Sequence, residues 1–413
     1  MQKRYQVLLV LSILSMITFL DRIALSSASK DVMADLHIDT NHWGWILGMF
    51  TLAYGAFEIP TGWLGDRIGG KKVLIRVVLW WSIFTILTGL STGFIMLLVV
   101  RFLFGMGEAG AYPNTSIVLS KWFPMVERGR AQAMIWGASR VGAALTPFVV
   151  IPIQRAYSWH VSFYVLGAIG IIWTIFWFFW HKEDPTESKD IKKEELEHIL
   201  SNRSIDTHGD GNTTFLSGFK SSNLWFLMGM YFCYATGTYF FQSWFHTYLQ
   251  AGRGLDTKDV LWASSLPYVL AAIGCFAGGW LSDQACLKWG KKWGRRILPM
   301  IGLLSSGVFM IFAALVHSNL YAVIALGLGM ALMDITAPVA WAVAMDIGGN
   351  KSGSVSGAMN TAGLTGAYLS TISFGYLATS FGYHVPVILI GIIVICAGFV
   401  WFKIDATKKI IFK

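Results

Sequence analysis

Five charged side chains lie inside long apolar stretches of the sequence: Asp21, Arg22, Arg101, Glu108 and Arg140. A charge at the centre of a membrane-spanning helix costs at least about 2.5–3.5 kcal/mol on insertion scales, so such residues mark a functional site by default. An arginine can hold a carboxylate through two parallel N–H groups, and a buried carboxyl group can exchange a proton. These residue types together predict a site that binds an organic anion and couples its movement to protons.

The spacing of the charges suggests how they pair. Asp21 and Arg22 are adjacent, so on a helix their side chains point about 100° apart and cannot pair with each other on one face. Arg101 and Glu108 are seven residues apart, two turns along one helix face. The economical arrangement pairs Asp21 with Arg101, which leaves Arg22 to bind a substrate carboxylate and Glu108 to titrate. For Asp21 and for Arg22, the alternative role is an ion pair that serves only the stability of the protein. This alternative carries more weight for Arg101, whose main role could be to influence the charge of Asp21.

Three intramembrane residues, Arg140 and two not yet named, have more open roles. Arg140 lies among the small residues of segment 137–142, which leave room for a ligand. It is either a second anion anchor, suited to a dicarboxylate, or a structural or snorkelling arginine. Asp334, with Pro338 close behind it, is a weaker candidate that could cap a broken helix. Tyr234 is expected to serve packing.

Polar residues on other apolar stretches are candidates for the same cavity. Tyr54 and Glu58 are four residues apart and share a helix face, with Tyr54 expected in the cavity and Glu58 in a gating or structural role. Gln242, Asn360 and Thr361 are neutral hydrogen-bonding residues that suit the hydroxyl groups of a sugar acid.

The elements that position these residues are membrane-spanning helices. Of the 413 residues, 55% are hydrophobic and 13% are charged, about half the charge fraction of a soluble domain. The four cysteines have no pairing or metal-binding spacing and are expected to be lone thiols. A spanning helix needs about 20 apolar residues. The sequence predicts twelve, at about 5–29, 43–64, 73–90, 94–119, 131–155, 160–181, 223–250, 260–285, 295–316, 320–345, 354–380 and 384–403.

The distribution of Lys and Arg orients these helices. If both termini are cytoplasmic, 25 of the 32 basic residues fall in cytoplasmic segments and four on the opposite face. This asymmetry is a strong positive-inside signal. The net charge of +9 therefore reflects topology and attraction to anionic lipid, and does not indicate a nucleic-acid partner.

A repeated motif divides the chain into two halves. Segments 62–72 and 279–296 share the order Gly-Trp-Leu-x-Asp followed by basic residues, with Asp66 and Asp283 at matched positions 217 residues apart. Such repeats are typical of secondary transporters that rock two bundles about a central site. We therefore expect an N-terminal six-helix bundle over 1–181, a cytoplasmic linker over 182–222 and a C-terminal bundle over 223–413. The two aspartates and Arg67 are expected to act as gating residues, and the charged stretch 189–198 is either a surface helix or disordered.

The first motif resembles the loop signature of the major facilitator superfamily, apart from Gly70 at a position that is usually basic. Three segments are similar to its anion:cation symporter branch, which includes bacterial sugar-acid permeases, sialin and vesicular glutamate transporters: 19–22, 101–113 and 121–131. The resemblance implies the major facilitator fold, Arg22 as anion anchor, and Asp21 and Glu108 as a protonatable pair. It also implies a multi-pass protein of the bacterial inner membrane.

Taken together, these features predict a proton symporter that imports a sugar acid or another small carboxylate, working as a monomer in the lipid bilayer. A drug or metabolite efflux antiporter of the same fold is the alternative. An enzyme is not expected, since the sequence has no phosphate-binding loop, nucleophile elbow or metal spacing, and neither a metal nor another cofactor is predicted.

Overall fold

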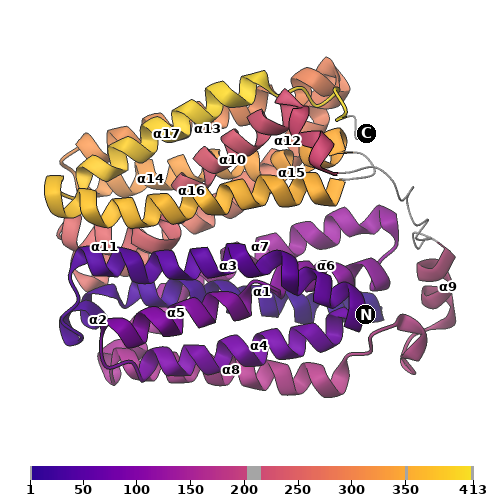
Figure 1. Ribbon diagram of the computed structural model, residues 1–413, viewed down its shortest axis with the longest axis horizontal. Coiled ribbons are helices and arrows are strands. Elements are labelled where there is room, and N and C mark those ends of the chain that lie inside the picture. The colour runs from indigo at the N-terminus through magenta and orange to yellow at the C-terminus, as the bar shows by residue number, and fades with distance from the viewer. Residues whose placement is uncertain (1, 202–214, 349–351, 411–413) are drawn as a thin grey trace. The chain divides into compact units, whose positions relative to one another are not determined.

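The structure is a computed structural model that describes residues 2–201, 215–348 and 352–410, and every regular element in these ranges is a helix (Figure 1). Helices are the expected spanning elements because a bilayer offers the backbone no alternative hydrogen-bond partners. The side chains of Asp66 and Asp283 lie outside the described residues, so their predicted gating role is untouched by the structure.

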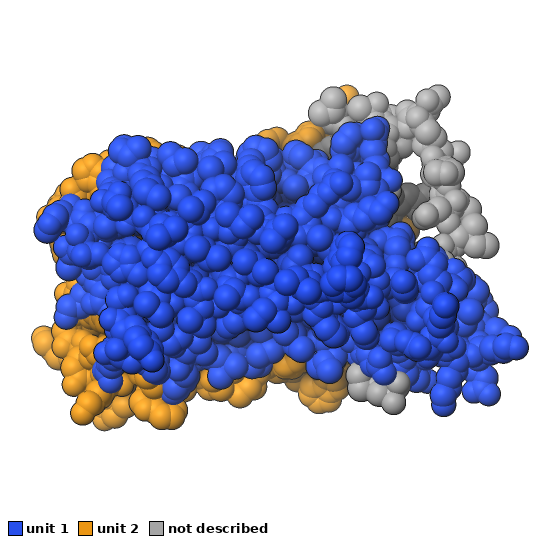
Figure 2. All heavy atoms as spheres, turned by 90° about the horizontal axis from the view of Figure 1, so that it is seen from below, with its two compact units in different colours: residues 1–38, 49–207 blue, residues 39–48, 208–413 orange. Residues whose placement is uncertain are grey.

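The chain forms two compact units, one of residues 1–38 and 49–207 and the other of residues 39–48 and 208–413 (Figure 2). The helices of the first unit are α1 (Lys3–Ser27), α2 (Ser29–Asp35), α3 (Thr40–Ile68), α4 (Gly70–Gly89), α5 (Phe94–Glu108), α6 (Ala111–Trp122), α7 (Met125–Ala156), α8 (Trp159–Trp180), η1 (Pro185–Glu187) and α9 (Lys193–Ser201). The first residues of α3 group with the second unit, where the Trp45 indole N–H donates to the hydroxyl of Tyr376 at 2.9 Å.

The second unit contains both long helices and short irregular turns. Its elements are η2 (Phe215–Lys220), α10 (Ser222–Tyr239), η3 (Phe240–Trp244), α11 (Phe245–Thr247), η4 (Tyr248–Gly252), α12 (Thr257–Gly294), α13 (Ile297–Leu315), α14 (Asn319–Asp334), α15 (Thr336–Gly348), α16 (Ser352–Phe381) and α17 (His384–Lys403). The predicted span 223–250 therefore loses α-helical geometry halfway, because η3 and η4 are π-helical turns.

Nine helical stretches in the described ranges are long and apolar enough to cross a membrane. The three other predicted spans coincide with α3, with α10 to η4 and with α16, which are helical along almost their whole length. The all-helical membrane fold is confirmed, and the helices are consistent with the predicted count of twelve.

The two units repeat the same helix pairings. In the first, α1 packs on α7 and α4 on α8; in the second, α10 packs on α16 and α13 on α17. A Cβ atom at Gly142 of α7 would lie 2.4 Å from the carbonyl oxygen of Met16, and one at Gly366 of α16 would lie 2.4 Å from that of Phe232. The same close backbone approach thus occurs at matched positions in each half, as expected for packing built on small residues.

Two spans are broken in the middle, one in each unit. The helix α5 ends at Glu108 and α6 begins three residues later, while α14 ends at Asp334 and α15 begins two residues later. A proline follows each break, and each proline lies against a glycine of a neighbouring helix: Pro113 against Gly62, and Pro338 against Gly279. Proline removes a backbone donor and clashes with the preceding turn, which accounts for a break at these points.

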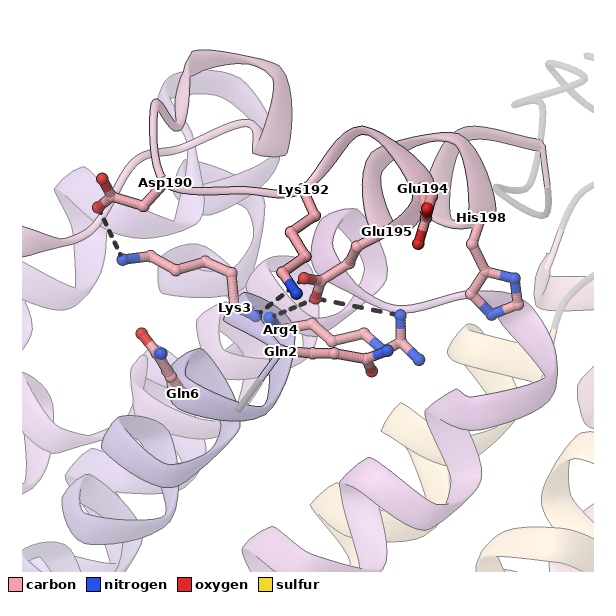
Figure 3. A pocket seen from close by; sticks show the side chains of 9 residues that line it. All are labelled: Gln2, Lys3, Arg4, Gln6, Asp190, Lys192, Glu194, Glu195 and His198. Carbon is pink, nitrogen blue, oxygen red and sulfur yellow. Dashed lines mark hydrogen bonds and ion pairs between the residues drawn. The ribbon is translucent and has the colours of Figure 1, made fainter.

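The polar segment after α8 contains a helix, α9, so part of the stretch 189–198 forms the surface helix that the sequence allowed. Glu195 of α9 is 5% exposed and accepts hydrogen bonds from the backbone N–H groups of Lys3 and Arg4 at 3.0 and 2.9 Å. Figure 3 shows this contact at the edge of a pocket of about 840 Å³ beside the start of α1. The carboxylate thereby satisfies two of the N–H groups that a helix start leaves open.

Candidate functional site

Arg22 and Glu108 form a buried ion pair in the first unit. The Arg22 Nε–H donates to Glu108 Oε1 at 2.5 Å, and the two side chains are 8% and 0% exposed. Arg22 comes from α1, and Glu108 is the last residue of α5, directly before the break described above. The sequence predicts that Arg22 and Glu108 each lack a charged partner, whereas the structure pairs them with each other.

Asp21 and Arg101 are both 2% exposed, but among the described residues they make no direct ion pair. The Arg101 guanidinium instead lies over the rings of Phe104 and Phe50, 4.4 and 5.1 Å from their centroids. It remains close enough to Asp21 and Glu108 to interact with both charges. Instead of the predicted Asp21–Arg101 ion pair, the structure shows a longer-range attraction between the two groups, and the arginine lies against aromatic faces that attract a cation.

Aromatic rings surround Arg22 as well. Its guanidinium lies 4.6 Å from the ring centroid of Tyr54, 5.2 Å from Phe19 and 5.5 Å from Phe50. Tyr112 is slightly farther, at 5.9 Å. Aromatic faces attract a cation and shield it from water, so they partly offset the cost of burying the arginine without using its hydrogen-bond donors.

Tyr112 is fixed in this wall by its own contacts. Its ring stacks on Trp136 of α7, with centroids 4.7 Å apart, and its hydroxyl lies 3.1 Å from Ser15 Oγ. The Ser15 hydroxyl proton is already donated to the carbonyl of Ile135, so Tyr112 is the donor in the second bond. Tyr112, in the first turn of α6, belongs to the segment 101–113 but carries no predicted role; its position directly before Pro113 and four residues after Glu108 is the signal that could have found it.

Arg140 of α7 shares Phe19 with Arg22. Its guanidinium lies 5.7 Å from the Phe19 ring centroid, and the residue is 6% exposed. The structure therefore places Arg140 in the same aromatic cluster as Arg22. Its choice between substrate anchor and structural residue stays a prediction.

The other predicted substrate-binding residues belong to the second unit. Gln242 lies in the π-helical turn η3 and is 8% exposed, and His246, four residues on, is 2% exposed. Asn360 is partly buried on α16, and Thr361 is exposed. A π-helical turn inside a helix is frequently found at a functional site.

Two of the predicted gating residues whose side chains the structure describes, Glu58 and Arg67, lie in the second half of α3. Arg67 stacks on Trp63, with its guanidinium 3.8 Å from a ring centroid, and Glu58 is partly buried. Sequence reasoning missed Glu183, which accepts hydrogen bonds from the N–H groups of Gly70 at 3.1 Å and Lys71 at 2.8 Å. Glu183 thus caps α4 directly after the motif loop, and its position as the first acid after span six was the available signal.

The family model of the Major Facilitator Superfamily matches residues 11–371. A probable sulfoacetate transporter of Cupriavidus necator is 31% identical, over 94% of this chain and 90% of its own. The hexuronate transporter of Bacillus subtilis is 33% identical, over 88% of this chain and 86% of its own length. The D-galactonate transporter of Escherichia coli is 29% identical, over 92% of this chain and 91% of its own length.

The fold agrees with solved structures. A bacterial homologue of the human lysosomal transporter Spinster, in an inward-facing and unoccupied conformation, superposes with a TM-score of 0.78 at 18% identity, covering 97% of this chain and 96% of the other. The chain belongs to the Major Facilitator Superfamily, whose members are membrane transporters and not enzymes.

Proposed function

We propose that this protein imports a small organic anion, a sugar acid or a related carboxylate, together with protons by alternating access. The observation that carries the proposal is the buried Arg22–Glu108 ion pair inside an aromatic wall. The names of the relatives, which include sulfoacetate, hexuronate and D-galactonate transporters, support this class of substrate.

The pair suggests how an anion and a proton are coupled. A substrate carboxylate that binds Arg22 competes with Glu108 for the same guanidinium. Removing one partner of a buried ion pair costs about 3–5 kcal/mol, because the other charge is left uncompensated. A proton on Glu108 removes that charge as the anion takes its place, so each ligand favours binding of the other.

Asp21 is the second proton carrier of the proposal. It is buried, and the neutral indole of Trp81 is the hydrogen-bond donor nearest its carboxylate among the described residues. A proton on Asp21 would remove the cost of a buried carboxylate, and Arg101 would tune that cost through its charge. If both acids are protonated with a monoanion bound, one net positive charge moves inward, which yields about 2.3 kcal/mol per 100 mV of membrane potential.

The remaining assignments belong to the same proposal. Arg140 is a second anchor, and Tyr54 supports Arg22; Gln242, Asn360 and Thr361 would bind hydroxyl groups. Asp66, Arg67, Glu58 and Asp283 would control access to the substrate site. The protein would work as a monomer in the bacterial inner membrane with both termini in the cytoplasm.

Uptake into proteoliposomes tests the proposal, with radiolabelled D-galactonate, D-glucuronate, D-glucarate and sulfoacetate as probes. Wild-type protein should accumulate at least one probe under an inward proton gradient. Glu108→Gln should lose this accumulation but keep exchange of internal for external substrate, because an amide can still leave Arg22 to the anion. Glu197→Gln, an exposed change on α9, is the matched control.

Arg22→Gln should weaken binding of the accumulated probe at least about tenfold, since a charge-assisted hydrogen bond contributes about 1.5–3 kcal/mol. The double variant Arg22→Gln with Glu108→Gln avoids an unpaired buried carboxylate and serves as the folding control. Gradient-driven accumulation by Glu108→Gln at the wild-type level would refute the proton role. Unchanged affinity in Arg22→Gln would refute the anchor role.

A further inference from the structure

A short extended segment follows the last helix of the first unit. His181 caps the end of α8 with φ −80° and ψ 143°, and its carbonyl oxygen accepts a hydrogen bond from the side chain of Lys71. Glu183, two residues on, accepts from the two N–H groups that open α4, and its Oε1 lies 2.5 Å from Lys121 Nζ near the end of α6. Residues 181–183, which we call the first clasp, therefore join the start of α4 to the end of α6.

The last helix of the second unit is followed by a segment with the same kind of contacts. Ile404 caps the end of α17 with φ −72° and ψ 134°, and its carbonyl oxygen accepts two hydrogen bonds from Arg296, at 3.2 and 2.7 Å. The carboxylate of Asp405, the next residue, lies 3.2 Å from Lys292 Nζ. Both basic residues belong to the second copy of the repeated motif. Residues 404–405 thus form a second clasp on the second motif.

The chain after the second clasp continues to further helix ends. The side-chain amide of Asn223, at the start of α10, donates to the Asp405 carbonyl at 2.9 Å, and the amide oxygen accepts from the Asp405 N–H at 2.9 Å. The N–H of Ile410 donates to the carbonyl of Ile347, one residue before the end of α15, at 2.8 Å. The tail 404–410 thus joins the start of α10 and the end of α15 to the second motif.

The two clasps hold matched parts of the two halves. The helix pairings make α4 equivalent to α13, and the broken spans make α6 equivalent to α15. In each half a basic side chain donates to the carbonyl that follows the last helix, and an acid one or two residues later contacts a lysine. The same contacts occur on different residues, since the capping residue and the acid differ between the two clasps. Contacts that recur at the motif of each half point to the movement that the motifs serve.

The strength of the clasps suits positioning more than overall stability. The side chains of Lys121 and Glu183 are 30% and 25% exposed, and those of Lys292 and Asp405 are 46% and 10% exposed. Ion pairs with this exposure contribute little to stability because water screens them. Glu183 gains in addition from the start of α4, where the helix dipole favours an anion. We therefore expect each clasp to fix the place of its motif loop more than to hold the bundle together.

We propose that Glu183 and Asp405 are positioning residues that hold each motif loop onto its own helix bundle, so that each bundle moves as one rigid body during transport. Rocking of two bundles requires that the helix ends within a bundle keep their places while the bundles move. Loss of either acid lets its loop move separately and slows the conformational change, while the substrate site stays intact. The role in transport rests on the proposed alternating access, whereas the hold on each loop can be measured without substrate.

Hydrogen–deuterium exchange of the substrate-free protein in lipid nanodiscs, read by mass spectrometry, tests the hold on the loops. Glu183→Ala removes the acceptor for the N–H groups of Gly70 and Lys71. The start of α4 should then take up deuterium at least about tenfold faster, the effect expected for loss of one charge-assisted hydrogen bond. The second motif should keep its wild-type rate in this variant.

Asp405→Ala should give the reverse pattern, with faster deuterium uptake over residues 286–296 and a wild-type rate at the start of α4. Glu197→Ala and Lys409→Ala, exposed changes outside both clasps, are the matched controls. If an alanine variant takes up deuterium faster along the whole chain, Glu183→Gln or Asp405→Asn, which keep the size of the side chain, give the same comparison. A wild-type rate at its own motif overturns the positioning role of that acid.

Exchange of internal for external substrate in proteoliposomes tests the role in transport. For a probe that wild-type protein transports, both alanine variants should lower the maximal rate at least about tenfold and change KM by less than about twofold, because only the conformational step is slowed. A raised KM at an unchanged maximal rate, or a wild-type rate in both variants, overturns the transport role. Failure of wild-type protein to transport any probe overturns the proposed function, and the transport role of the clasps with it.

Discussion

His181, which follows α8, is a buried imidazole with an unusual set of neighbours. It is 1% exposed and stacks on Trp177, with centroids 3.8 Å apart, while Trp122 lies 5.5 Å away. Burial, and to a smaller extent the charges of Lys71 and other nearby lysines, lowers the pKa of His181 to about 3. The ring is therefore neutral in the folded protein at every physiological pH.

This shift predicts a pH dependence of stability. The pKa of His181 is lower in the folded state than in the unfolded state, where it is near 6.5. The unfolded state therefore binds a proton first, and stability is lost as the pH falls from about 6.5 towards 3, at no more than about 1.4 kcal/mol per pH unit. His181→Phe keeps the stacking but cannot titrate, so its melting temperature should fall less between pH 7 and pH 4. Parallel melting curves for both proteins would contradict the assignment.

The charged residues show how far the sequence alone could lead. Asp21, Arg22, Arg101 and Glu108 could be found because charges in apolar stretches stand out, and the structure buries all four. Their pairing could not be found, because the rotation of one helix against another and the positions of rings such as Phe50 depend on packing across helices. Whether Arg22 pairs with one acid or another depends on distances of a few ångströms between helices. The spacing of residues along the chain does not give these distances.

Among the elements, the helix α9 is short, and it needs tertiary contacts to be stable. A nine-residue helix is marginal by itself in water. Glu195 ties it to the start of α1, and His198 Nε2 lies 3.3 Å from Glu127 in the first turn of α7. Arg4 lies between them, 3.2 Å from Glu127 and 4.0 Å from Glu195. The helix therefore connects the starts of α1 and α7.

Two alanine variants on α9 test this role. Glu195→Ala removes the acceptor of two backbone N–H groups and should lower stability by about 1–2 kcal/mol, as the loss of a helix cap does. Glu197→Ala, on the exposed side of the same helix, should change it by less than about 0.5 kcal/mol. Thermal unfolding in detergent, followed by circular dichroism, measures both. Equal melting temperatures for the two variants would show that the Glu195 contact is weak.

Most elements could be predicted from hydropathy, but of their interruptions only the break at Asp334 was anticipated, because Pro338 suggested a broken helix there. The predicted spans 94–119 and 320–345 show no pause at Glu108 or Asp334, although prolines follow both. The π-helical turns of span seven arise at an aromatic-rich stretch, 239–248, whose side chains pack on one another and on α16. The apolar composition of a segment indicates that it is buried in lipid or protein. It does not indicate whether its backbone is α-helical, π-helical or interrupted.

At the scale of the whole molecule, the repeat of close backbone contacts gives a paired prediction. Gly142→Ala and Gly366→Ala each place a methyl group 2.4 Å from a carbonyl oxygen, so each should destabilise the protein by about 1–3 kcal/mol. Gly229→Ala, where nothing lies within 4 Å, should be neutral or slightly stabilising. Melting temperatures of the three variants decide the matter, and a neutral Gly366→Ala would mean that the two contacts are not equivalent.

The matched glycines also bear on the history of the gene. Gly366 lies 224 residues after Gly142, and Phe232 lies 216 residues after Met16, so the two contacts lie at comparable places in the two halves, as expected if the halves arose by duplication. In the register of Met16 and Phe232, Arg22 corresponds to Thr238 in the second half. A duplicated ancestor would thus have kept its backbone contacts while its charges diverged. Selection on such a protein would act on two sets of residues. The older set would be the small residues shared by both halves, and the younger set would be the charged residues particular to each half.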